Sequence, residues 1–216
     1  MIFDRVLDEL GTAVTDGTLE PGHTVSIDGL VGRTQASRSI VREAVRVLVG
    51  LGLLAARRRV GVTVQPATEW DVLDPRVIGW RLAGPDRAAA LADLRALRRA
   101  VEPAAAATAA ERVSTRATDG REALLAAADR LTTATGPGDA ATFLQADRDL
   151  HRAVLDLSGN ALFVRLGRVL GRALDERAGI GPDAHDVRLH VDLVRAVVAG
   201  DARGAAAAMQ EIVDRT

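Results

Sequence analysis

The chain from Gly84 to Thr216 consists of Ala- and Leu-rich runs, without the alternating apolar pattern of a β-strand. Five short stretches rich in Gly, Asp and Ser interrupt these runs: VSTRATDG, TGPGD, DLSGN, GIGPDAHD and AGDARG. Stretches of this kind mark the ends of helices. We therefore expect about six helices packed as a bundle, in which the abundant Ala favours the helical state and permits close helix packing.

Composition excludes several classes of protein. The chain has 216 residues and no Cys, so disulfide frameworks, cysteine-ligated zinc fingers and cysteine nucleophiles are excluded. The N-terminus MIFDRVLDEL carries acidic residues where a secretory signal needs a basic region. No run reaches the roughly 18 apolar residues of a membrane span. The sequence therefore predicts a cytoplasmic protein without a membrane segment.

The first 66 residues have a different pattern. Apolar residues recur at helical spacing from Ile2 to Val14, and SIDGLVGR predicts a short second helix capped by Ser26 or Asp28. The stretch TQASRSIVREAVRVLVGLG predicts a stronger third helix, capped by Ser37 or Ser39. The β-prone runs LLAARRR and VGVTVQP follow. Three helices and a hairpin are typical of a winged helix-turn-helix, whose third helix enters the major groove of DNA.

Arginine residues gather on this third helix. Its apolar positions cover about half of the helix surface, and Arg38, Arg42 and Arg46 lie together outside them. Between residues 33 and 59 there are seven Arg against one acid, Glu43. Such a local basic patch predicts binding to double-stranded DNA, because Arg pairs with guanine and with phosphates. The alternative is a solvated helix face with no partner.

Residues 17 to 66 resemble the DNA-binding domain of the GntR family of transcriptional regulators, most specifically in SRSIVREAVRVL. The resemblance implies that the recognition helix contacts DNA through Ser37, Arg38, Ser39 and Arg42, and Arg46 completes the predicted set. It also implies that Gly61 lets the wing approach the DNA closely. The chain departs from the family pattern in the second helix, at Gly29-Leu30-Val31, and at TQASR, where the family usually has LGVSR.

The segment from residue 67 to 82 contains both tryptophans, Trp70 and Trp80. They either anchor two domains to each other or complete a local core. We expect a DNA-binding domain in residues 1–66, this segment as a linker, and a helical effector-binding and dimerisation domain in residues 83–216. The pattern W..LDP..I.W also resembles regulators of the FadR branch that respond to sugar acids.

One predicted helix carries a carboxylate and an imidazole on the same side. Asp147 and His151 are four residues apart in QADRDLHRAV, so both can reach one ion. His190, at the start of another predicted helix, is a candidate third ligand. One Asp with two His suits zinc, nickel, manganese or iron better than calcium or magnesium. The alternative is a buried His bonded to Asp without metal.

The helical region resembles the FCD ligand-binding domain of FadR-type regulators. The matching stretches are RRAVEP at 98–103, Asp147 through His151, SGN at 158–160, and His190 through Met209. Many FCD domains bind a divalent metal through one Asp and three His, and the resemblance implies Asp147, His151 and His190. The fourth position is Ile212, which cannot coordinate, so water or an effector carboxylate would complete the shell. His185 is a poor substitute.

Arg98 is a candidate cation for an anionic effector, with a salt bridge to Glu102 as the alternative. The function that these features favour is a transcriptional regulator, as a repressor. It would bind an operator as a homodimer and respond to a small carboxylate, with a sugar acid as the candidate. The alternatives are a metal-dependent enzyme or a metal- or acid-binding module using Asp147, His151 and His190. We find no nucleophile or general base beside these ligands, which disfavours the enzyme.

Overall fold

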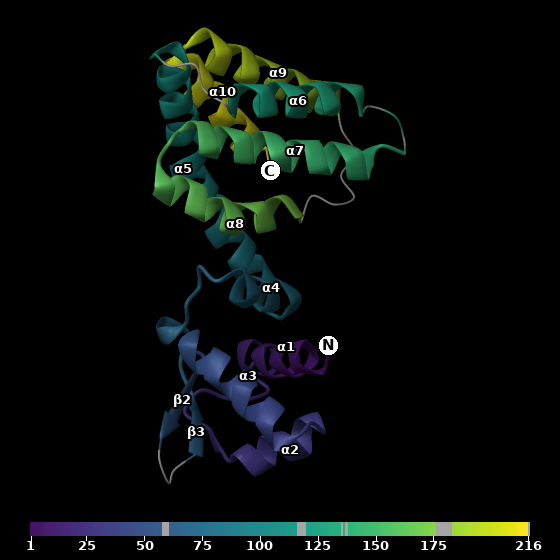
Figure 1. Cartoon of the computed structure of the whole chain (residues 1–216), viewed down its shortest axis with the longest axis vertical. Coiled ribbons are helices and arrows are strands. Elements are labelled where there is room, and N and C mark those ends of the chain that lie inside the picture. The colour runs from purple at the N-terminus through teal and green to yellow at the C-terminus, as the bar shows by residue number, and fades with distance from the viewer. Residues whose placement is uncertain (58–60, 116–119, 135, 137, 176–182, 216) are drawn as a thin grey trace. The chain divides into compact units, whose positions relative to one another are not determined.

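The computed structural model describes residues 1–57, 61–115, 120–134, 136, 138–175 and 183–215 (Figure 1). These residues confirm the predicted fold class, which is mainly helical with a small sheet near the N-terminus. The chain divides into two compact units, residues 1–91 and 92–216. Arg58, Arg59 and parts of three predicted helix breaks lie outside the described residues. Within the described ranges, no helix is long and apolar enough to cross a membrane.

The first unit begins with the three predicted helices, α1 (Ile2–Thr15), α2 (Ile27–Thr34) and α3 (Arg38–Gly50). The hydroxyl of Ser26 caps α2 by accepting a backbone N–H from its first turn, and the hydroxyl of Ser37 does the same for α3. Each cap satisfies one of the backbone donors that the start of a helix leaves without an intrahelical partner. The apolar side of α3 packs into the core of this unit.

A three-stranded antiparallel sheet forms the wing. Its strands are β1 (Thr24–Val25), β2 (Leu54–Arg57) and β3 (Gly61–Val64), with β3 in the middle. The register places Val25 opposite Val62 and Ala55 opposite Thr63. The two β-prone runs of the sequence are therefore the hairpin strands β2 and β3, and β1 is an addition that its two residues did not reveal.

Gly61 is required by the sheet itself. Its φ is +117°, which side chains rarely adopt, and a Cβ atom there would lie 2.9 Å from the carbonyl oxygen of Val25. The close approach of β1 to β3 therefore accounts for this glycine, whether or not the wing also contacts DNA.

The tryptophan segment is folded. It forms the 3₁₀ turn η1 (Ala67–Glu69) and the helix α4 (Pro75–Ala83). The indole of Trp80 is buried and donates a hydrogen bond of 3.0 Å to the carboxylate of Asp8, and Trp70 donates one of 3.1 Å to the carbonyl oxygen of Gln65. Both rings pack against the core of the first unit. The structure thus shows the local-core alternative for the tryptophans.

Six helices account for the second predicted region. They are α5 (Arg87–Thr115), α6 (Gly120–Thr133), α7 (Ala140–Leu157), α8 (Ala161–Asp175), α9 (Ala184–Ala199) and α10 (Ala202–Asp214). In the second unit α7 packs between α8 and α6, α6 also contacts α9, and α9 packs against α10, as Figure 1 shows. The boundary between the two units falls within α5.

The inner side of α5 is made of small residues. Ala105, Ala106, Ala109 and Ala110 are fully buried in the core of the second unit, together with leucines of α6 and α7. A methyl side chain lets neighbouring helices approach closely without a helix-propensity penalty. The Ala-rich composition therefore has the packing role that the sequence predicts.

The helix that carries His190 begins earlier than predicted. Its first residue is Ala184, because the carboxylate of Asp183 accepts the backbone N–H groups of His185 and Asp186 and so caps the helix there. The prediction that His190 starts this helix is therefore wrong. His190 lies in the second turn, and Asp186 lies one turn before it.

A stability test follows from the packing of α1 against Trp80. A Cβ atom on Gly11 would lie 2.5 Å from the indole ring, whereas one on Gly32 of α2 would meet open space. Gly to Ala in a helix normally stabilises by about 1 kcal/mol, but overpacking a core costs about 1–3 kcal/mol. We expect Gly11→Ala to lower the melting temperature followed by circular dichroism, and Gly32→Ala to leave it unchanged or raise it. Equal stability of the two variants would contradict this packing.

Candidate functional site

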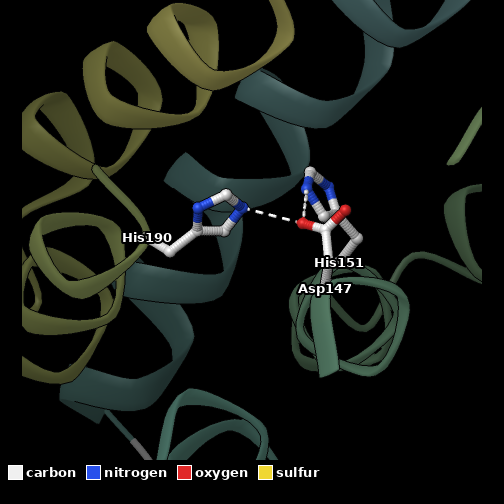
Figure 2. A group of neighbouring side chains, drawn as sticks. All are labelled: Asp147, His151 and His190. Carbon is white, nitrogen blue, oxygen red and sulfur yellow. Dashed lines mark ion pairs between the residues drawn. The ribbon is translucent and has the colours of Figure 1, made fainter. Parts of the chain in front are cut away.

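Asp147, His151 and His190 meet inside the second unit (Figure 2). Asp147 and His151 lie one turn apart on α7, and His190 extends toward them from α9. The Nε2 atom of His190 is 2.8 Å from Oδ1 of Asp147, and Nε2 of His151 is 3.4 Å from the same oxygen. All three side chains are buried. The structure therefore brings together the three ligands that the sequence predicts.

The three donors suit one metal ion. One ligand atom from each residue lies within 4.8 Å of the other two, and tetrahedral bonds of about 2.1 Å would place such atoms roughly 3.4 Å apart. Among the described residues, the Nε2 atoms of both histidines and Nδ1 of His151 have no partner in hydrogen-bond geometry, although a carboxylate oxygen lies close to each of them. Two imidazoles and a carboxylate fit zinc, nickel, manganese or iron.

The other nitrogen of each ring lies beside an oxygen atom. Nδ1 of His190 lies 2.7 Å from the backbone carbonyl oxygen of Asp186, and Nδ1 of His151 lies 2.5 Å from Oε2 of Glu102. Sequence reasoning did not assign either partner to the site. The contact with Glu102 joins α5 to α7, so no local spacing indicates it.

Arg98 and Glu102 form a buried ion pair on α5. The Arg98 Nε atom donates to Oε1 of Glu102 at 2.8 Å, an Nη2 contact to the other oxygen measures 3.5 Å, and each side chain is 1% exposed. The structure thus contains the salt bridge that was the alternative to an effector contact. An effector-binding role for Arg98 stays a prediction.

The ion pairs shift the titration of the cluster. Burial alone would raise the pKa of the Glu102 carboxyl, but the charges of His151 and Arg98 lower it to about 2. Burial would lower the pKa of His151, but Glu102 and Asp147 raise it to about 9. Burial also opposes ionisation of Asp147, and contacts with the His151 and His190 rings outweigh it, so its pKa lies well below the usual range.

Two further positions considered from the sequence add no ligand to the three donors. Ile212 is fully buried in the apolar core of the second unit and offers no ligand atom. His185 is partly exposed, and its Nε2 lies 3.5 Å from a carboxylate oxygen of Glu211. Within the part of the chain that the structure describes, the site therefore has three donors.

A surface cavity of about 270 Å³ lies elsewhere in this unit, between α7 and α8. Its lining residues are Arg152, Leu155, Asp156, Ala161, Val164, Arg165, Gly167 and Arg168. None of the predicted effector-binding residues belongs to that lining.

The predicted recognition helix α3 presents its arginines to solvent. Arg38 is tied to α2 by a 2.5 Å ion pair with Asp28, and Arg46 pairs with Glu43 at 2.9 Å. Arg42 is exposed and, among the described residues, makes no hydrogen bond or ion pair. Of these three arginines, Arg42 is therefore the one whose guanidinium has no partner among the residues that the structure describes.

The two serines at the start of this helix, Ser37 and Ser39, are exposed and lie next to each other. The Ser37 hydroxyl accepts the N–H of Ile40 at 3.5 Å and lies 3.3 Å from the hydroxyl of Ser39. Ser37 thus has a structural role as the helix cap in addition to its predicted contact with DNA.

A winged helix-turn-helix joined to a helical unit with a buried polar site is the architecture of a ligand-responsive DNA-binding protein. The FCD domain profile matches residues 93–215, and the profile of bacterial regulatory proteins of the gntR family matches residues 3–64. The galactonate operon transcriptional repressor of Escherichia coli (strain K12) is 31% identical over 186 residues, covering 84% of this chain and 79% of the repressor. The chain belongs to the GntR family of transcription regulators and carries an FCD domain.

Solved structures agree with this fold. Streptococcus agalactiae GntR superposes with a TM-score of 0.55 at 22% identity, covering 98% of this chain and 97% of that chain. Lar, described as controlling expression of the Listeria monocytogenes agr system, gives a TM-score of 0.62 at 15% identity, covering 100% and 94%. The family comprises transcription regulators rather than enzymes, which sets the metalloenzyme alternative aside.

The raised pKa of His151 predicts how stability depends on pH in the metal-free protein. A group whose pKa is raised by folding from 6.5 to about 9 stabilises the folded state fully below pH 6.5, and this contribution is lost as pH rises through 9. We expect the melting temperature of chelator-treated protein to fall across that range. The fall should be smaller in His151→Gln, whose side chain does not titrate.

The composition leaves few other groups that titrate between pH 6.5 and 9. The chain has no Cys, Tyr or Lys, so only its four His and the amino terminus have ordinary pKa values near that range. His185→Gln, which changes a partly exposed His of α9, is the matched control and should keep the wild-type profile. A wild-type profile in His151→Gln would show that the cluster does not set the pH dependence.

Proposed function

We propose that this protein is a repressor of the FadR branch of its family, in which a small carboxylate effector binds a metal ion held by Asp147, His151 and His190. The observation that carries the proposal is the convergence of these three buried donors. Three protein ligands leave coordination positions for water or for an oxygen-rich ligand. When bound, the ion supplies a Lewis-acidic anchor for the carboxylate.

A sugar acid is the effector class that we propose. The E. coli relative is named for the galactonate operon, and the matched region covers most of both chains. A sugar acid offers a carboxylate and neighbouring hydroxyls, and such oxygens can complete the shell of a metal with few protein ligands. The missing ligand at Ile212 supports this proposal, because it leaves one more position for the effector.

The DNA-binding role rests on the exposed arginines of α3. We propose that Ser37, Arg38, Ser39, Arg42 and Arg46 contact the operator, with the wing at Gly61 beside them. Two copies of a helix-turn-helix bind two half-sites of a pseudo-palindrome, so the proposed functional form is a homodimer. Effector binding in the second unit would change the affinity of that dimer for the operator.

Arg42→Ala tests the operator contact. Loss of a base-contacting Arg costs about 1–3 kcal/mol, so operator affinity should fall roughly 10- to 100-fold. Gel shifts at several salt concentrations, with the DNA upstream of the gene as probe, measure the affinity and its salt dependence. Arg76→Ala, an exposed Arg on α4, is the matched control and should bind like wild type. Binding by wild type that is independent of DNA sequence would contradict the proposal.

A thermal-shift screen tests the effector site. We expect galactonate and related sugar acids to raise the melting temperature of zinc-loaded protein, because a ligand stabilises the state that binds it, and chelator to abolish the rise. His151→Gln should lower metal content and blunt the effector response while operator affinity stays near wild type. His185→Gln is the control. Wild-type protein that takes up no zinc and responds to no carboxylate would refute the metal-assisted sensor.

A further inference from the structure

In both histidines of the site, His151 and His190, the nitrogen that faces away from Asp147 is Nδ1, and it lies against an oxygen of another residue. His190 shows the simpler case. The backbone carbonyl of Asp186 can only accept a hydrogen bond, so at 2.7 Å it requires a proton on Nδ1 of His190. A neutral His190 then carries its lone pair on Nε2, which is the nitrogen 2.8 Å from the Asp147 carboxylate.

His151 has a similar arrangement with a different neighbour, although its Nδ1 contact is an ion-pair contact that lies outside hydrogen-bond geometry in this structure. Its Nδ1 lies 2.5 Å from Oε2 of Glu102, and its Nε2 faces Asp147. An ionised carboxylate is also an obligatory acceptor, so it too favours the tautomer with the proton on Nδ1. Glu102 therefore does for His151 on α7 what the Asp186 carbonyl does for His190 on α9.

Arg98 fixes the orientation of Glu102. Its guanidinium contacts both carboxylate oxygens, at 2.8 and 3.5 Å, and both side chains are almost fully buried. A side chain held at both oxygens cannot rotate away from the His151 ring without breaking a charge-assisted hydrogen bond. The pair spans one turn of α5, so the helix backbone itself sets its geometry.

We propose that Glu102, held by Arg98, is the positioning residue that makes His151 a metal ligand through Nε2. This inference rests on the proposed metal site and adds two residues of α5 to it. Hydrogen bonds from metal-bound histidines to such carboxylates typically change metal affinity 10- to 100-fold when removed. Arg98 thus has a role at the site that does not require contact with an effector.

The test compares Glu102→Gln with Glu122→Gln, a matched change at an exposed carboxylate of α6. The probe is Zn²⁺ alone, and its dissociation constant is measured by competition with a chromophoric chelator. We expect Glu102→Gln to weaken binding 10- to 100-fold and Glu122→Gln to match wild type. Glu102→Asp, which keeps the charge, should recover part of the loss. Arg98→Lys keeps the positive charge but loses the planar guanidinium that can contact both oxygens of Glu102. We expect it to weaken Zn²⁺ binding less than Glu102→Gln does.

A second measurement uses the wild-type protein and does not depend on the folding of any variant. Nitrogen-15 correlation spectra of the zinc-loaded chain report which ring nitrogen of His151 carries the proton. We expect a protonated Nδ1 and a zinc-bound Nε2. Coordination through Nδ1, or wild-type zinc affinity in a folded Glu102→Gln, would overturn the inference while leaving the metal site intact. Wild-type protein that binds no zinc would overturn the proposed metal-assisted function together with it.

Discussion

The ion pair between Arg98 and Glu102 determines whether a polar cluster can exist in the interior of the second unit. Removing an ionised group from water costs several kcal/mol unless opposite charges and hydrogen bonds replace the solvent. Here Glu102 is compensated on one side by Arg98 and on the other by His151, whose second nitrogen faces Asp147. Arg98, Glu102, His151 and Asp147 therefore follow one another with alternating charge. The rings of His151 and His190 both face Oδ1 of Asp147.

Because its charges are paired, the cluster can place ionised and imidazole side chains within an apolar core. The surrounding core is made of apolar side chains, mostly Ala, Leu and Val, together with Phe143, Met209 and Ile212. In the metal-free state the protonated His151 and Arg98 together balance the charges of Glu102 and Asp147, and both carboxylates raise the pKa of His151. A divalent metal ion would replace the proton on Nε2 of His151 and bring one more positive charge beside Asp147, so occupancy by a metal and by that proton are alternatives.

Local features of the structure were predictable from spacing in the sequence. Among contacts between distant segments, the meeting of His190 with Asp147 and His151 was predicted through the resemblance to FCD domains. Ser37 caps the helix that begins at the next residue by accepting an N–H three residues ahead, and Asp147 and His151 lie one turn apart, so spacing alone indicates both. The contact between Glu102 and His151 joins α5 to α7, and no periodicity encodes it. The start of α9 was misplaced because its first turn lies within the stretch GIGPDAHD, whose composition is that of a break, whereas the carboxylate of Asp183 makes it a cap.

The stripe of fully buried alanines on α5 limits how this domain can vary. At Ala105, Ala106, Ala109 and Ala110 any larger side chain would add volume where neighbouring helices already touch, and overpacking is destabilising. Glycine is the one smaller residue, and it weakens a helix by about 1 kcal/mol at each position. Residues without any chemical function are thus as constrained as the charged cluster one turn away. Substitutions at this seam should therefore destabilise the second unit even though its residues carry no charge.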